Sequence, residues 1–288
     1  MLTLNEYCRR TFGEKLYKLS LNAGMTCPNR DGTLDSRGCI FCSAGGSGDF
    51  APDPALSLPE QIEAAKARVA AKYRGSRYIA YFQAFTNTYA PAEHLRRLFT
   101  PVVEREDVAV LSVATRPDCL PGETLDLLGE LNRRRPVWVE LGLQTIHPDT
   151  AAYIRRGYDL PCYDRAAAEL RARGIHVVTH VILYLPGEGR ERMLETVRYA
   201  AERSDGIKLQ LLHVLEGTDL AAEWRAGRVH LPTLEEYAAT VRDCVALLPE
   251  ETVVHRMTGD GPKRILLAPL WSGDKKRVLN TLNRALGR

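Results

Sequence analysis

Five short runs of apolar, β-branched and aromatic residues recur at a nearly regular spacing along the chain. They cover residues 78–82, 108–113, 137–141, 175–185 and 207–215. Runs of this length and composition predict buried strands. Their first residues are 30, 29, 38 and 32 positions apart, about the length of one strand plus its crossover helix. The pattern therefore predicts consecutive parallel βα units.

The segments between these runs predict helices. The expected helices cover residues 58–73, 91–103, 121–134, 164–173 and 188–203. Several begin with a proline at an early helical position and a glutamate two or three residues later, as helices often do. An opening strand at 18–22 brings the βα units to six.

Six βα units predict an α/β fold, namely a partial (β/α)6 barrel. A doubly wound sheet is the alternative. We expect residues 1–230 to form the core barrel, and residues 231–288 to form a short extension of helix and strand that caps or extends the open edge.

Composition narrows the class of protein. Of the 288 residues, 45% are hydrophobic and 26% are charged, which is ordinary for a soluble globular chain. No apolar run is long enough for a signal peptide or a membrane span, so we expect a cytoplasmic protein with no membrane partner. The net charge of +3 does not by itself indicate nucleic-acid binding, although basic clusters occur at 9–10, 133–135, 155–156 and 275–277.

Three of the seven cysteines lie in one loop that follows the opening strand and is rich in turn-forming residues. Cys27, Cys39 and Cys42 have the spacing Cys-x11-Cys-x2-Cys. Three thiolates can ligate three irons of a 4Fe-4S cube and leave the fourth iron open, whereas a structural zinc ion needs a fourth ligand. The alternatives are a zinc site completed by a distant residue and a chance grouping of buried thiols.

The other cysteines have no such spacing. They are Cys8, Cys119, Cys162 and Cys244. We expect them to be inert thiols, with Cys8 exposed near the N-terminus.

Polar motifs follow the predicted strands at the edge where functional groups of such folds gather. They lie at residues 81–89, 115–118, 140–145, 185–188 and 213–218. Together with the cysteine loop, they resemble the YhcC/YtqA-type family of radical S-adenosylmethionine (SAM) enzymes, and more distantly the radical SAM domain of the elongator catalytic subunit. The resemblance extends through nearly the whole chain.

The resemblance implies the cofactors and the chemistry. A 4Fe-4S cluster on Cys27, Cys39 and Cys42 would bind SAM at its open iron and cleave it to methionine and a 5'-deoxyadenosyl radical, which abstracts hydrogen from the substrate. The electron would come from a donor such as flavodoxin or ferredoxin.

Residues that contact SAM are also implied by resemblance. Phe41 would flank the adenine and Gln144 would reach the ribose. Many relatives bind the methionyl amine with Gly-Gly-Glu, which is absent here; Gln83, Thr86 and Asn87 offer hydrogen-bonding groups at that place instead.

For the SAM carboxylate the candidates are Arg116 and Arg156, because guanidinium can bind a carboxylate with two parallel hydrogen bonds. Arg156 stands beside Arg155 and is equally well explained as a surface charge. Thr115 and His180 complete the set of cofactor-binding candidates.

Three residues are candidates for substrate chemistry. Lys208, in the sixth strand, is expected to face the barrel interior. His213 lies near the end of the same predicted strand, and Arg256 belongs to a segment, 253–260, that resembles a family signature. A lone histidine in an apolar strand, such as His180 or His213, is also consistent with a core residue whose hydrogen bonds are satisfied. Glu140 in mid-strand is expected to be a buried partner for a cation.

The closest family members imply that the substrate is the carbon-five side chain of a transfer-RNA wobble uridine. Arg9, Arg10, Arg155, Arg156 and residues 275–277 would then contact phosphates. The alternatives are a radical SAM reaction on a small metabolite and a non-catalytic iron-sulfur protein that carries electrons. The sequence leaves the oligomeric state open.

Overall fold

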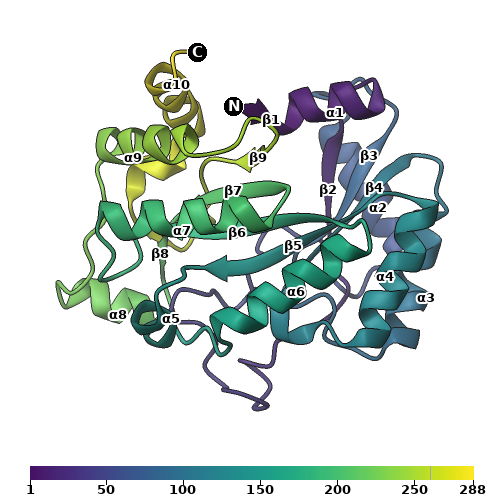
Figure 1. The fold of residues 1–288 in the computed structure, drawn as a ribbon, viewed down its shortest axis with the longest axis horizontal. Coiled ribbons are helices and arrows are strands. Elements are labelled where there is room, and N and C mark those ends of the chain that lie inside the picture. Colours follow the sequence, from purple (N-terminus) through teal and green to yellow (C-terminus); the bar gives the residue numbers. More distant parts are fainter. Residues whose placement is uncertain (260) are drawn as a thin grey trace.

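The computed structural model describes residues 1–259 and 261–288, and its centre is one curved parallel sheet of eight strands (Figure 1). The strands are β1 (Leu2–Thr3), β2 (Tyr17–Leu21), β3 (Tyr78–Phe82), β4 (Val108–Thr115), β5 (Val137–Gln144), β6 (His176–Leu183), β7 (Gly206–Leu211) and β9 (Val253–Arg256). Their order in the sheet is β1-β9-β7-β6-β5-β4-β3-β2.

This order confirms the partial barrel. From β2 to β7 the strands follow one another without reversal, whereas a doubly wound sheet reverses its order at a switch point, so that alternative is wrong. All six predicted strands are present. The segment 253–260 extends the edge as expected, because β9 pairs with β7 on one side and β1 on the other; residue 260 itself lies outside the described residues.

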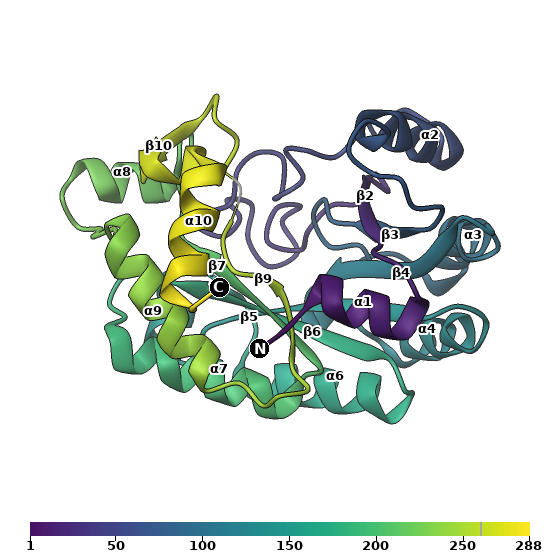
Figure 2. The same ribbon diagram turned by 90° about the horizontal axis from the view of Figure 1, so that it is seen from above.

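All five predicted helices are also present on the outer, convex face of the sheet (Figure 2). They are α2 (Leu58–Val69), α3 (Ala92–Val103), α4 (Gly122–Arg134), α6 (Leu160–Ala172) and α7 (Arg190–Arg203). Helix α6 begins four residues before the predicted start, because the Asp159 side chain accepts the Cys162 N–H and caps the helix.

Several short elements were not predicted. They are α1 (Leu4–Phe12), α5 (Pro148–Tyr153), α8 (Asp219–Arg225), α9 (Leu234–Ala246), α10 (Lys275–Ala285), the antiparallel pair β8 (Val214–Leu215) and β10 (Leu266–Ala268), and two 3-10 turns, Pro117–Cys119 and Leu270–Gly273. Helix α1 packs Tyr7 and Phe12 against Trp138 near the amino ends of the strands. Cys8 belongs to the same apolar cluster and is fully buried, so the expectation that it is exposed is wrong.

The sheet is buried on both faces, which explains the continuous apolar runs in the sequence. Every residue of β3 and β4 is buried. The concave side nevertheless carries polar side chains in mid-strand, including Ser112, Glu140 and Lys208. Within the described ranges, no helix is long and apolar enough to cross a membrane.

Candidate functional site

A cavity of about 850 Å³ follows the concave side of the sheet from the cysteine loop to the barrel interior. Fourteen of the fifteen candidate site residues line it: Cys27, Cys39, Phe41, Cys42, Gln83, Thr86, Thr115, Arg116, Gln144, Arg156, His180, Lys208, His213 and Arg256. The fifteenth, Asn87, is fully buried and donates its Nδ2 to the Ala114 carbonyl 3.0 Å away. Thus residues from five strands, the cysteine loop and other loops after the strands meet in one place, while their roles stay predictions.

A second, mostly apolar cavity of about 790 Å³ lies outside the barrel beside α3, α4 and α6. It contains none of the candidate residues. Cys119 and Cys162 line it.

The cysteine loop is closed by its own hydrogen bonds. The Cys42 N–H donates to the Cys39 carbonyl at 3.0 Å, and Arg30 Nη2 donates to the Cys42 and Ser43 carbonyls at 2.7 and 2.6 Å. Gly38 has φ +77°, and a Cβ there would lie 2.8 Å from Arg30 Nε. Only glycine fits this turn comfortably, so the loop presents its thiols on a defined backbone.

The three thiols provide a donor set suited to an iron-sulfur cluster. Burial raises the pKa of Cys39 to about 11. Burial also raises the pKa of Cys42, against the opposing effect of the Arg30 guanidinium. In the described part of the chain, no three Cys, His, Asp or Glu side chains form a site for a single metal ion; a four-iron cube instead takes each thiolate on a different iron.

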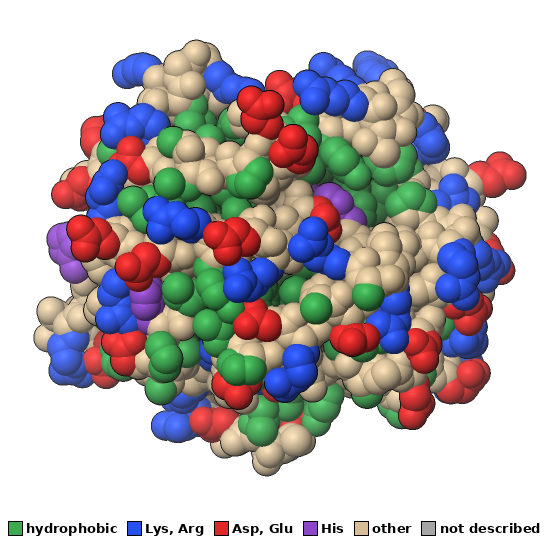
Figure 3. All heavy atoms as spheres, viewed as in Figure 1, with side chains coloured by type: hydrophobic (Ala, Val, Ile, Leu, Met, Phe, Trp, Pro, Cys, Tyr) green, Lys and Arg blue, Asp and Glu red, His purple; other side chains and the backbone are tan. Residues whose placement is uncertain are grey.

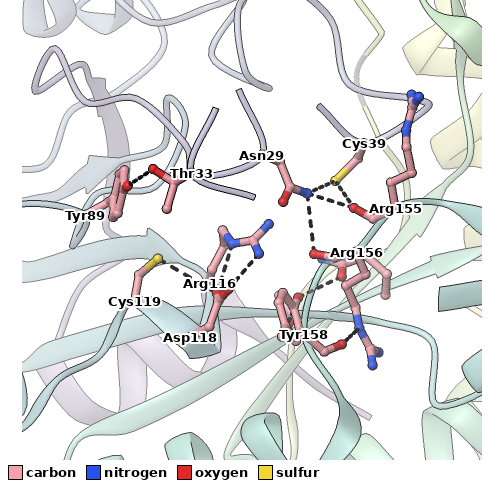
Figure 4. Close-up of polar contacts among 12 residues, drawn as sticks. Asn29, Thr33, Cys39, Tyr89, Arg116, Asp118, Cys119, Arg155, Arg156 and Tyr158 are labelled. Carbon is pink, nitrogen blue, oxygen red and sulfur yellow. Dashed lines mark hydrogen bonds and ion pairs between the residues drawn. The ribbon is translucent and has the colours of Figure 1, made fainter. Parts of the chain in front are cut away.

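Arg116 faces the cysteine loop from the end of β4 (Figure 4). Its Nε and Nη2 donate to the two Asp118 carboxylate oxygens at 2.9 and 2.7 Å, and its guanidinium lies 5.0 Å from the centre of the Tyr158 ring. Its Nη1 forms no hydrogen bond within residues 1–259 and 261–288. An arginine held in this way keeps donors available for a ligand.

Arg156 is only 3% exposed, so its interpretation as a surface charge is wrong. Its Nη1 donates to the Leu143 and Thr145 carbonyls at 3.1 and 2.6 Å, on either side of Gln144. Its guanidinium lies 4.8 Å from the Tyr158 ring. Arg156 therefore shapes the end of β5, whether or not it also contacts a ligand.

Gln144 has a left-handed backbone, with φ +62°, which is uncommon for a residue with a side chain and often marks a functional position. Its Oε1 accepts the Tyr158 hydroxyl at 3.0 Å. The same hydroxyl lies 2.9 Å from the Gly142 carbonyl oxygen, so its one proton is shared between the two acceptors.

A polar cluster forms the inner end of the cavity. Glu140 is contacted by Lys18 Nζ at 2.6 Å, by His180 Nε2 at 2.8 Å, by Lys208 Nζ and by Ser112 Oγ at 3.0 Å. The expectation that Glu140 partners a buried cation is confirmed.

The charges of this cluster depend on one another. Burial alone would raise the pKa of Glu140, but Lys18 and Lys208 hold it well below its usual range. Burial, with Lys208 beside it, lowers the pKa of His180 to about 4. Burial also lowers the pKa of Lys208. His180 is therefore neutral at pH 7, with Glu140 and Gln210 as its hydrogen-bond partners. It also lines the cavity, and its role toward a cofactor stays a prediction.

Lys18 and Tyr81 belong to this cluster but were not among the predicted site residues. Lys208 Nζ lies 3.2 Å from the Tyr81 hydroxyl, and both lysines lie over its ring. The available signal was a lysine in the opening strand, where a charge is unusual for a buried parallel strand.

His213 and Arg256 lie at the side of the cavity next to the C-terminal region. His213 Nε2 lies 3.1 Å from Ser272 Oγ, and Arg256 ends β9. Neither touches Glu140 through a hydrogen bond or ion pair in the described ranges.

The chain belongs to the radical SAM superfamily, which matches residues 34–200, followed by the Radical_SAM C-terminal domain at 204–288. It is 46% identical to the uncharacterized protein YtqA of Bacillus subtilis over 99% of this chain and 88% of the relative. It is 40% identical to protein YhcC of Escherichia coli K12 over 96% of this chain and 89% of the relative. The resemblance inferred from the motifs is thereby confirmed.

A solved structure of the archaeal Elp3 of Methanocaldococcus infernus shares the fold with a TM-score of 0.66 at 17% identity. The match covers 93% of this chain and 63% of that one. The present chain therefore spans under two thirds of that Elp3 chain.

Proposed function

We propose that this radical SAM protein holds a 4Fe-4S cluster on Cys27, Cys39 and Cys42 and binds SAM beside it. The cluster and SAM together would supply reductive cleavage to methionine and a 5'-deoxyadenosyl radical. The observation that carries the proposal is the convergence of the three thiols with Arg116 and Gln144 on one cavity. The protein itself would orient SAM, exclude water and hold the substrate at the inner end.

We further propose that the substrate is the carbon-five side chain of a wobble uridine in transfer RNA. Sequence similarity to Elongator complex protein 3 supports this substrate; the Schizosaccharomyces pombe protein is 28% identical over 62% of this chain. A wobble base lies in a flexible loop and can leave its stack to enter a cavity.

The exposed side of α10 and the chain end after it suit a polyanion. Lys275, Lys276, Arg277, Arg284 and Arg288 are exposed, and residues 275–288 contain no acidic residue. The face with α5, α6 and α7, in contrast, mixes cations and anions (Figure 3). Arg156 is buried and the Arg155 guanidinium pairs with Asp219 at 2.6 Å, so the expectation that these two bind phosphates is wrong for Arg156 and disfavoured for Arg155.

Anaerobic reconstitution tests the cofactor. The unchanged chain should bind about four irons and show broad visible absorbance, and Cys27→Ser, Cys39→Ser and Cys42→Ser should each lose it. Cys244→Ser is the matched control, since that buried thiol lies in α9. A cluster that survives all three loop substitutions would contradict the proposal.

Mass spectrometry of transfer-RNA nucleosides tests the substrate. A deletion strain should accumulate an unprocessed wobble uridine, and the plasmid-borne gene should restore the processed one. Unchanged nucleosides would favour the small-metabolite alternative.

A further inference from the structure

Asn29 lies two residues after Cys27 and connects the cysteine loop to the segment after α5. Its side chain is buried, and the whole residue is 2% exposed. Nδ2 lies 2.7 Å from the Arg155 carbonyl oxygen and 3.5 Å from Cys39 Sγ (Figure 4). The Asn29 carbonyl also accepts the Gly38 N–H at 2.7 Å. One residue thus binds both the thiol of Cys39 and a separate element of the fold.

The two N–H groups of the Asn29 side chain have matching acceptors among the neighbouring groups. A primary amide has two N–H groups, and here one points to a carbonyl and one to sulfur, with the Arg156 carbonyl a further acceptor at 3.5 Å. The two carbonyls can only accept, so the nitrogen rather than the oxygen of the amide faces them.

The opposite side of the amide is closely packed. A Cβ on Gly157 would lie 2.8 Å from Asn29 Oδ1, and Gly157 has φ +83°. A side chain at position 157 would therefore clash with the amide, and the 2.7 Å hydrogen bond to the Arg155 carbonyl orients its nitrogen toward Cys39.

An N–H directed at a cysteine sulfur stabilises negative charge on that sulfur. A reduced cluster carries one more electron than an oxidised one, so a donor to a ligand sulfur stabilises the reduced form more and raises the reduction potential.

Resting on the proposed function, we propose that Asn29 is a positioning residue that holds Cys39 against residues 155–156 and raises the reduction potential of the cluster. The same contact links the cysteine loop to Arg156 and hence to the end of β5, where Gln144 lies. These contacts fix the position of the cysteine loop relative to the proposed SAM-binding residues at the end of β5.

The test is Asn29→Asp in the reconstituted full chain. An ionised carboxylate has no donor and a protonated one has a single donor. The Arg155 carbonyl and the Cys39 sulfur therefore cannot both accept a hydrogen bond from residue 29. A redox titration monitored by electron paramagnetic resonance should give a more negative midpoint than the unchanged chain. Asn29→Ala, which removes the donors without adding charge, should shift the midpoint in the same direction.

Asn132→Asp is the matched control. Asn132 also donates its Nδ2 to a carbonyl, that of Gly174 at 3.0 Å, but has no sulfur contact. It should keep the midpoint of the unchanged chain.

The outcomes separate the two proposals. An unchanged midpoint in either Asn29 variant overturns the role of Asn29. Failure of both variants to assemble a cluster, while Asn132→Asp assembles one, supports the positioning role. If the unchanged chain forms no cluster at all, the proposed function fails first.

Discussion

Arg116 and Arg156 were equal candidates in the sequence, and their surroundings make them different. Arg116 uses two N–H groups on Asp118, whereas Arg156 uses three on backbone carbonyls. Since a guanidinium has five N–H groups, Arg116 retains more of them for a ligand. Tyr158 lies between the two and joins them to Gln144.

Tyr158→Phe tests whether this arrangement serves SAM. The ring over both arginines remains, but the hydrogen bond to Gln144 is lost, which typically costs about 0.5–1.5 kcal/mol. We expect the SAM dissociation constant to rise about 2- to 12-fold by equilibrium dialysis, with iron content unchanged. Tyr153→Phe, at an exposed tyrosine, is the control; equal SAM affinity in the two variants would show that the hydroxyl does not position Gln144.

At the scale of elements, the helices of the barrel begin where local side chains satisfy their first N–H groups. Ser57 Oγ accepts the Glu60 N–H, and the Glu60 carboxylate accepts the Ser57 N–H at 2.8 Å. This capping box starts α2, whose Ala65, Arg68 and Val69 line the cavity. The capping box thus fixes the start of a helix that contributes residues to the cavity wall.

Ser57→Ala should destabilise the fold by about 1 kcal/mol, because the Glu60 N–H loses its side-chain acceptor and the Glu60 carboxylate loses the Ser57 hydroxyl. Urea unfolding monitored by circular dichroism measures the change. Ser36→Ala, in the exposed part of the cysteine loop, should change stability by less than about 0.5 kcal/mol. Equal midpoints for the two variants would count against the cap.

At the scale of the whole molecule, the buried polar cluster couples stability to pH. The folded pKa of His180 is about 4, below the 6.5 of a free histidine. Between these values the unfolded chain binds a proton that the folded chain does not, so stability falls as the pH drops from about 6.5 to 4. Burial lowers the pKa of His255 as well, and its effect has the same sign.

We therefore expect the free energy of unfolding to be smaller at pH 5 than at pH 7, with His180 contributing on the order of 2 kcal/mol. Urea unfolding at both pH values measures it. His180→Gln should reduce the pH dependence, while His94→Gln, at an exposed position, should retain it. A pH dependence unaffected by His180→Gln would refute the assignment.

The basic residues of α10 also belong to the scale of the whole molecule, because they would contact a separate macromolecule. If α10 binds RNA phosphates, the affinity for transfer RNA should fall steeply with salt through counterion release. Replacing Lys276 and Arg277 together by glutamate should weaken binding and flatten the salt slope by about one to two units, without impairing SAM cleavage. Arg198→Glu on α7 is the control; similar effects of both changes would indicate that α10 is not the contact surface.

The sequence alone predicted the main strands and helices of the barrel and identified the cysteine loop as a candidate cofactor site. Parallel strands buried on both faces are mostly apolar, so the period of about 30 residues was visible, and the three cysteines are close enough in sequence to read as one site. Short elements such as α1 and β1 escaped prediction because they are stabilised by contacts with distant strands rather than by their own pattern.

Only the tertiary structure decided which polar residues meet. Lys18, Glu140 and Lys208 are far apart in the chain, and the sequence around a charged strand residue does not indicate which residue it pairs with. Curvature of the sheet brings them within hydrogen-bonding distance. Asn29 likewise reads as a turn residue until the fold places the Arg155 carbonyl and the Cys39 sulfur beside its amide. Local patterns report backbone preferences and burial, whereas hydrogen-bond partners depend on where the barrel closes.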